Sequence, residues 1–220
     1  MKPKVITCRV MLEEFRALMP EDTEFEVFEI SQHTWPNTLR ANLQAAVTKA
    51  DGLFDPIYLG YGLCSQSLVG LSAQQSRLIV FRADDCIGIF LGSRQARRDL
   101  VLKEPGSYFL TRGWIADGAG SVFDEYERME KRYGAERAMR IFKKLLAHYR
   151  QLVHIVMPGA ENVHSDRLYA SGKAAKFGLD YVEIPGTDEL IRRMTEGVED
   201  PEILIFPPGR TIALDDMLNL

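Results

Sequence analysis

The hydrophobic and polar positions of this 220-residue chain follow two periods, one typical of strands and one typical of helices. Short apolar runs bounded by turn residues predict buried strands, and an alternating run predicts a strand with one solvent-facing side. Strands are expected on this basis at residues 5–8, 25–30, 57–61, 78–82, 152–157, 181–184 and 203–206.

Helical spacing separates these runs. Leu12, Phe15 and Leu18 predict a helix after the first strand, and Pro36 suits the first turn of a second helix that continues to about Lys49. In the middle of the chain, residues 105–111 predict a turn and a short strand or extended loop, and residues 118–120 predict a break. Residues 121–150 predict one long helix or two abutting ones that meet at Gly134, and later helices begin near residues 162 and 187.

The alternation of strands and helices predicts the α/β class, with a mostly parallel sheet that carries helices on both faces. Two domains are expected: a cysteine-bearing α/β lobe at residues 1–115 and a second α/β lobe at residues 116–220. Each lobe is compatible with a Rossmann-like arrangement.

Composition narrows the classes of partner and location. Apolar residues make up 46% of the chain, which is enough for a substantial core, and the net charge is −4 with a pI of about 5.7. Because no basic patch dominates, no nucleic-acid partner is expected. No apolar run is long enough to span a bilayer or to serve as a signal peptide, so we expect no membrane association and a cytoplasmic location.

Each of the three cysteines follows a predicted strand. Cys8 closes the first strand, Cys64 follows the strand at 57–61, and Cys86 follows the strand at 78–82. Since ligands of open α/β sheets bind beyond the carboxyl ends of the strands, three thiols far apart in sequence are expected to share one site. An odd number of cysteines argues against a disulfide framework and favours metal binding or catalysis.

The segments around Cys64 and Cys86 allow more than one interpretation. Gly60 and Gly62 flank Tyr61 and let the backbone approach a ligand, and Cys64 is expected at a helix amino terminus, which stabilises a thiolate. The alternative is a tight turn with an inert, buried cysteine.

Before Cys86, Asp84 or Asp85 is expected to cap a helix and Arg82 to pair with either acid. The sharper interpretation makes Cys86 a metal ligand with these acids in its outer shell.

A fourth ligand is available in His33, which lies between a predicted strand and the helix begun by Pro36. Three sulfurs and one imidazole match a tetrahedral zinc site, although His33 is equally typical of an exposed turn. His154, inside a strand, is better explained as a core histidine, whereas His148 is expected on a polar helix face and His164 near a helix start.

Three segments together resemble one family, the domain of unknown function numbered sixteen thirty-eight. They are Tyr58-Leu59-Gly60-Tyr61-Gly62-Leu63-Cys64, then Arg82-Ala83-Asp84-Asp85-Cys86-Ile87 with Leu91-Gly92-Ser93, and Pro105-Gly106-Ser107-Tyr108-Phe109-Leu110-Thr111-Arg112-Gly113-Trp114. The resemblance covers roughly residues 5–206. Cys8 and His33 match an early cysteine and a histidine of the family, although the family's usual Leu-His-Asn reads Gln32-His33-Thr34 here. The resemblance implies a link to corrinoid-dependent methyl transfer in anaerobes.

We therefore expect a metal-site protein of one-carbon metabolism in which Cys8, His33, Cys64 and Cys86 bind zinc and activate a small substrate. An enzyme would be a metal-dependent methyltransferase that presents a substrate thiol as a nucleophile. The alternatives are a [4Fe–4S] cluster on the three cysteines with an open iron, a non-catalytic partner of a corrinoid protein or methyltransferase that delivers metal, and a structural domain with buried thiols.

The remaining candidate ligand contacts are Gly60, Tyr61, Gly62, Arg82, Asp85, Tyr108 and Trp114. Tyr108 and Trp114 are large side chains with a polar tip, and we expect their segment to line a pocket that faces the cysteines. Simple packing between the lobes is the alternative for this segment.

Overall fold

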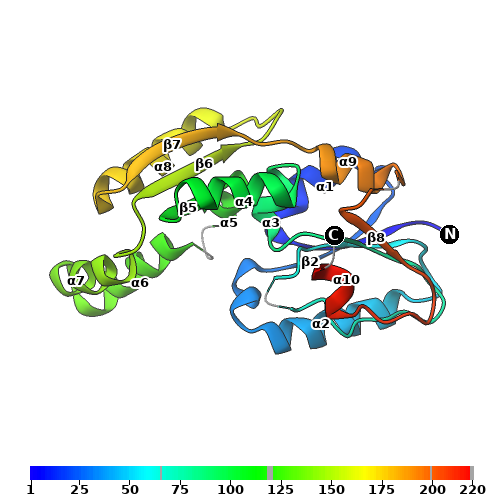
Figure 1. Cartoon of the computed structure of the whole chain (residues 1–220). Coiled ribbons are helices and arrows are strands. Elements are labelled where there is room, and N and C mark those ends of the chain that lie inside the picture. Colours follow the sequence, from blue (N-terminus) through cyan, green and yellow to red (C-terminus); the bar gives the residue numbers. More distant parts are fainter. Residues whose placement is uncertain (65, 118–120, 199, 219–220) are drawn as a thin grey trace. The chain divides into compact units, whose positions relative to one another are not determined.

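The structure is a computed structural model that describes residues 1–64, 66–117, 121–198 and 200–218 (Figure 1). The break expected at residues 118–120 lies outside this part. The chain forms two compact units, one made of Met1–Ala96 with Thr187–Leu220 and the other of Arg97–Gly186. The expected boundary near residue 115 falls inside the second unit, and the division into domains 1–115 and 116–220 stays a prediction.

The first unit contains a five-stranded sheet in the order β2-β1-β3-β4-β8. The first four strands in this order are parallel, and β8 runs antiparallel to β4 at the edge. The strands are β1 (Lys4–Cys8), β2 (Glu24–Phe28), β3 (Ile57–Gly60), β4 (Leu78–Phe81) and β8 (Ile203–Phe206). All five strands predicted for these regions are therefore confirmed to within two residues.

Helices cover both faces of this sheet, as the sequence predicts (Figure 1). On one face, α2 (Pro36–Ala50) packs Leu39 and Leu43 against alternate strand residues, and Pro36 occupies its first turn. On the other face, Phe15 of α1 (Leu12–Leu18) meets Phe81 at a ring distance of 6.2 Å. The shorter elements of the unit are η1 (Arg9–Met11), η2 (Ile30–Thr34), α3 (Cys86–Phe90), α9 (Glu189–Thr195) and α10 (Leu214–Leu218).

The second unit holds a three-stranded, fully parallel sheet in the order β5-β6-β7. Its strands are β5 (Ser107–Leu110), β6 (Gln151–Val156) and β7 (Asp180–Pro185). Its helices are α5 (Arg112–Asp117), α6 (Val122–Tyr133), α7 (Ala135–Leu145) and α8 (Val163–Phe177), and α4 (Arg94–Lys103) spans the junction of the two units in the sequence. Aromatic side chains of α6, α7 and α8 form the apolar cluster on one face of this sheet.

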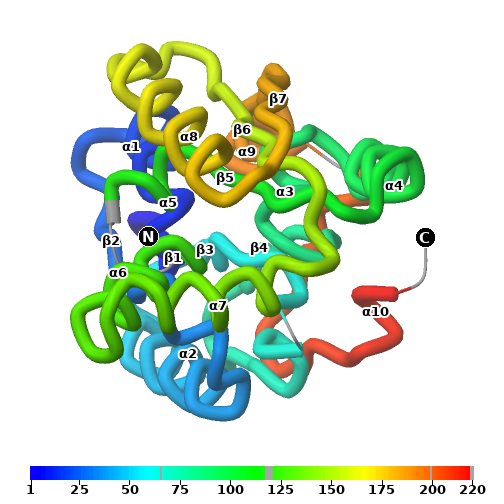
Figure 2. The backbone as a smooth tube through the Cα atoms, turned by 90° about the vertical axis from the view of Figure 1, so that its left-hand side faces the viewer, coloured from blue at the N-terminus to red at the C-terminus, as the bar shows by residue number. Residues whose placement is uncertain are grey.

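Gly134 separates α6 from α7, which run side by side as a helical hairpin (Figure 2). Its φ of +81° suits glycine and confirms the predicted break. A capping box of Ser121 and Asp124 starts α6. The hairpin ends at Leu145 rather than near residue 150, so His148 lies exposed in a turn and not on a helix. No helix in the described residues is both long and apolar enough to cross a bilayer.

Candidate functional site

The strand order of the first unit marks one point on the carboxyl edge of the sheet. The chain passes from β1 to β2 on one side and places β3 and β4 on the other side. In doubly wound sheets, ligands bind outside the carboxyl ends of the strands where the strand order reverses in this way. Here that point lies between β1 and β3, where Cys8 ends β1 and Cys64 follows β3.

Backbone hydrogen bonds join the loop that carries Cys64 to the loop that precedes Cys86. The Leu63 amide donates to the Ala83 carbonyl at 2.7 Å, and the Cys64 amide donates to the Asp84 carbonyl at 3.1 Å. A Cβ atom at Gly62 would lie 2.9 Å from the backbone of Asp85, so only glycine lets the two loops approach this closely.

The three thiols act on one another electrostatically. Burial, with smaller contributions from the charges of Cys8 and Asp85, raises the pKa of Cys64 to about 12. The pKa of Cys86 is raised well above its ordinary value, first by burial and then by Cys64, Asp85 and Cys8. Since charges act on one another over several ångströms, the three cysteines lie near one another at this edge of the sheet, and we call them the cysteine cluster; none of them forms a disulfide.

Cys64 does not begin a helix, and this part of the sequence interpretation is wrong. It lies in a turn with φ +43°, and Gln66 follows with φ +67°. No helix dipole stabilises its thiolate there, which agrees with a raised rather than a lowered pKa. Non-glycine residues in the left-handed region carry a conformational cost and concentrate at functional sites.

Tyr61 lies in the same cluster. It is only 3% exposed, and it belongs to the apolar core against which Cys8 and Cys64 pack. Burial raises its pKa, and the charges of Cys8 and Cys64 raise it further. Its hydroxyl oxygen is buried without a hydrogen-bond partner in the part of the chain that the structure describes.

The acidic residues before Cys86 have separate roles. Asp85 is the N-cap of α3, and its Oδ1 accepts a hydrogen bond from the Gly88 amide at 3.1 Å, so the capping interpretation is confirmed. Asp84 forms its ion pair with Arg94 at 2.7 Å rather than with Arg82. The Nε atom of Arg82 is buried and makes no hydrogen bond to any described residue.

His33 lies exposed in η2, where its Nδ1 is hydrogen-bonded to the Ile30 carbonyl. Its charge is not among those that shift the pKa of Cys64 or Cys86. Among the residues with described positions, no three histidine, cysteine, aspartate or glutamate side chains are gathered tightly enough to hold a metal ion. The three cysteines thus lie at one edge of the sheet without forming a metal-binding group in the described chain, and their role as ligands, with His33 as the fourth, stays a prediction.

Tyr108 and Trp114 pack within the second unit. The Tyr108 hydroxyl accepts a hydrogen bond from the Val122 amide at 3.1 Å, and its ring meets Phe123 edge-on at 5.2 Å. Trp114, in α5, packs against the same apolar cluster. These contacts give both side chains a structural role, and the pocket expected to face the cysteines stays a prediction.

The other histidines belong to the second unit. His154 is 2% exposed in β6, and its Nδ1 lies 3.1 Å from the Tyr181 hydroxyl. The interpretation as a satisfied core histidine is therefore confirmed. His164 is exposed in the first turn of α8.

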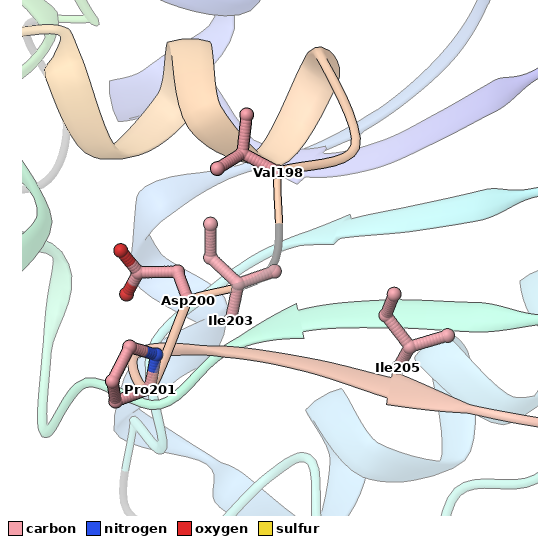
Figure 3. Close-up of a pocket in the computed structure, with 5 residues that line it drawn as sticks. All are labelled: Val198, Asp200, Pro201, Ile203 and Ile205. Atoms are coloured by element: carbon pink, nitrogen blue, oxygen red, sulfur yellow. The ribbon is translucent and has the colours of Figure 1, made fainter.

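A surface pocket of about 510 Å³ lies beside the edge strand β8 (Figure 3). Val198, Asp200, Pro201, Ile203 and Ile205 line it. Its one carboxylate, Asp200, is paired with Arg193, which leaves a mostly aliphatic lining without converging polar groups. The reactive groups of the first unit are therefore those of the cysteine cluster rather than those of this pocket.

Two buried polar residues of the first unit, Thr7 and Glu14, were missed at the level of sequence. Thr7 is fully buried beside Cys8, and its Oγ1 donates toward the carbonyls of Cys8 and Gly60 at 3.2 and 3.3 Å, which ties the ends of β1 and β3 together. The sequence signal for Thr7 was a polar residue inside an otherwise apolar strand. Glu14, in α1, has a buried carboxylate oxygen and a pKa raised to about 7. The helical spacing of the residues around Glu14 did not predict that its carboxylate is buried.

Comparison with known proteins gives one family and no named relative. No curated protein and no solved structure matches the chain. One family model, described as "Protein of unknown function (DUF1638)", matches residues 27–195, a narrower range than the resemblance suggested. The match contains His33, Cys64 and Cys86 and begins after Cys8. Since it spans well over half of the sequence, the chain belongs to the DUF1638 family.

Proposed function

We propose that the cysteine cluster binds a thiophilic metal centre, with zinc as the first choice, and uses it to activate a small substrate. The observation that carries this proposal is the mutual electrostatic influence of Cys8, Cys64 and Cys86 at the point where the strand order reverses. Ligand binding at such a point is the general behaviour of doubly wound sheets.

The chemistry of the donors fits a metal cation. The thiols of Cys64 and Cys86 have raised pKa values, so they ionise together only where a positive charge compensates them. Metal binding deprotonates its thiol ligands and thereby supplies that charge. Because no three candidate ligands are gathered tightly in the described residues, binding requires the sulfurs to move closer together.

His33 is suited to serve as the fourth zinc ligand. Nδ1 of His33 is hydrogen-bonded to the Ile30 carbonyl, which leaves Nε2 as the ring nitrogen that could bind a metal. Histidines that bind metals use the same arrangement, in which a backbone carbonyl fixes the tautomer. Because His33 is exposed, a substrate can also replace it.

In the enzyme version of this proposal, a bound zinc would act as a Lewis acid that lowers the pKa of a substrate thiol. The chain would hold that substrate beside the cysteine cluster and exclude water with Tyr61 and the apolar core. The resemblance to a family linked to corrinoid-dependent methyl transfer makes a methyl acceptor the proposed substrate and a corrinoid protein or methyltransferase the proposed partner. A protein that only delivers metal to such a partner would use the same ligands.

A [4Fe–4S] cluster on the three cysteines is the second candidate. The exposed position of His33 in η2 favours a centre held by sulfur alone. A cluster also needs its cysteines further apart than a single ion does, which agrees with the lack of a tight group of ligands in the described chain.

Single substitutions test the proposal and separate the two centres. We expect Cys64→Ser and Cys86→Ser each to lose most of the bound metal, measured as metal per chain after anaerobic purification, because ligating thiolates are removed. His148→Ala, an exposed histidine in a turn, is the matched control and should keep the metal. A large loss in His33→Ala supports zinc, and little loss supports the cluster. Unchanged metal in both cysteine variants would refute the site.

A further inference from the structure

Tyr61 is fixed in place by the two glycines that flank it. A Cβ atom at Gly60 would lie 2.2 Å from Thr7 Oγ1, and one at Gly62 would lie 2.9 Å from the Asp85 backbone. The backbone on both sides of Tyr61 is thus packed against the end of β1 and the loop before α3. Such packing leaves Tyr61 little freedom to turn out of the core.

The side chain of Tyr61 is directed at the cysteines. The parallel register pairs Thr7 with Gly60, so the next residues, Cys8 and Tyr61, reach the same edge of the sheet. Cys8 and Cys64 pack against the apolar core that contains Tyr61, and their charges act on its hydroxyl. The hydroxyl of Tyr61 therefore lies in the buried end of the sheet near Cys8 and Cys64, and no described sulfur is within hydrogen-bond distance of it.

The unpartnered hydroxyl calls for an acceptor. A buried O–H group without a partner costs about 1–3 kcal/mol, and most buried hydroxyls in proteins are satisfied. The hydroxyl of Tyr61 has no partner among the described residues, and a neutral thiol would be only a weak acceptor for it. A thiolate bound to a metal is a much stronger acceptor, because hydrogen bonds to ionised groups are about twice as strong.

We propose that the Tyr61 hydroxyl donates a hydrogen bond to a metal-bound sulfur, that of Cys8 or Cys64, and so acts as a positioning residue of the site. This inference rests on the proposed metal function. Hydrogen bonds to ligand atoms orient the ligands of metal centres and tune the metal's affinity and electronic structure. This role would explain the sequence Gly60-Tyr61-Gly62. The two glycines allow close packing of the backbone, and the tyrosine between them donates the hydrogen bond to the sulfur.

Tyr61→Phe removes the hydroxyl and keeps the ring. We expect zinc to bind about 10- to 100-fold more weakly, measured by competition with a chromophoric chelator, as is typical when a hydrogen bond to a metal ligand is lost. In protein loaded with Co²⁺, the sulfur-to-cobalt charge-transfer band should shift, because the electron density on the sulfur changes. The metal-free variant should melt at the same temperature as the wild type or higher, since an unsatisfied buried group has been removed.

Tyr58→Phe is the matched control. Tyr58 is 6% exposed in β3, three residues before Tyr61, and its pKa is raised by burial, with Arg77 and Asp55 rather than a cysteine as the charges that act on it, so removal of its hydroxyl should leave affinity and spectrum unchanged. Wild-type affinity and an unshifted band in Tyr61→Phe would overturn the inference while the proposed function stands. Failure of the wild type to bind Zn²⁺ or Co²⁺ would overturn both.

Discussion

Burial raises the pKa of one carboxyl group in α1, that of Glu14. It lies in the first turn of α1, with Oε2 buried and without a hydrogen-bond partner among the described residues. Burial, with a smaller contribution from Glu13, raises its pKa to about 7. The folded state thus favours the neutral acid. The contribution of neutral Glu14 to the free energy of unfolding is complete below the unfolded pKa of about 4.5 and is lost as the pH rises through the folded pKa of about 7.

Glu14→Gln should therefore stabilise the protein at pH 8 and have little effect at pH 4.5. The expected gain at pH 8 is on the order of 3 kcal/mol, because each unit of pKa shift corresponds to about 1.4 kcal/mol. Urea unfolding at the two pH values measures it. Glu13→Gln removes the charge of the neighbouring, exposed side chain and serves as the control. A gain that does not depend on pH would contradict the explanation by burial.

At the scale of elements, the contact between the loop after β3 and the loop before α3 depends on Gly62. Gly62→Ala places a methyl group 2.9 Å from backbone atoms of Asp85, which cannot move aside as a flexible side chain would. We expect a loss of about 1–3 kcal/mol in the free energy of unfolding, as is typical of overpacking, together with weaker metal binding.

Gly172→Ala, in the middle of α8, is the matched control for that substitution. Nothing lies within 4 Å of its added Cβ, so the same change should stabilise the protein by about 0.5–1 kcal/mol through higher helix propensity. Equal effects of the two substitutions in urea unfolding would show that the loop contact is not tight.

The sequence predicted the elements better than it predicted their local ends. Strands such as Ile203–Phe206 agree residue for residue, because apolar runs between turn residues are a local signal. The predicted helix at Cys64 is absent because the loop there is held by hydrogen bonds to residues 83 and 84, which are distant in sequence. The antiparallel pairing of β8 with β4 is likewise a long-range choice that periodicity does not encode.

The same distinction explains what could be predicted of the site. The convergence of Cys8, Cys64 and Cys86 followed from the general rule for carboxyl ends of parallel strands. The exposure of His33 in η2 agrees with its interpretation as an exposed turn residue, and spacing could not decide between that and a metal ligand because both place the histidine between a strand and a helix.

At the scale of the molecule, the unit that carries the cysteines is discontinuous in sequence. Residues 187–220 return to it and supply β8, so the five-stranded sheet is complete only when both ends of the chain are present. The family match, over residues 27–195, contains neither β1 nor β8. Cys8 thus joins the cluster from a strand outside the matched segment.

The metal content and visible absorbance of the anaerobically purified, full-length protein test the central claim, that the three cysteines share one metal centre. The account predicts colourless protein with about one zinc per chain, and no metal in the variant that carries Cys8→Ser, Cys64→Ser and Cys86→Ser. Broad visible absorbance with about four irons per chain, lost in the same variant, would keep the shared centre and replace zinc by a cluster. Metal retained in the triple variant, or a wild type that takes up neither zinc nor iron, would contradict the claim.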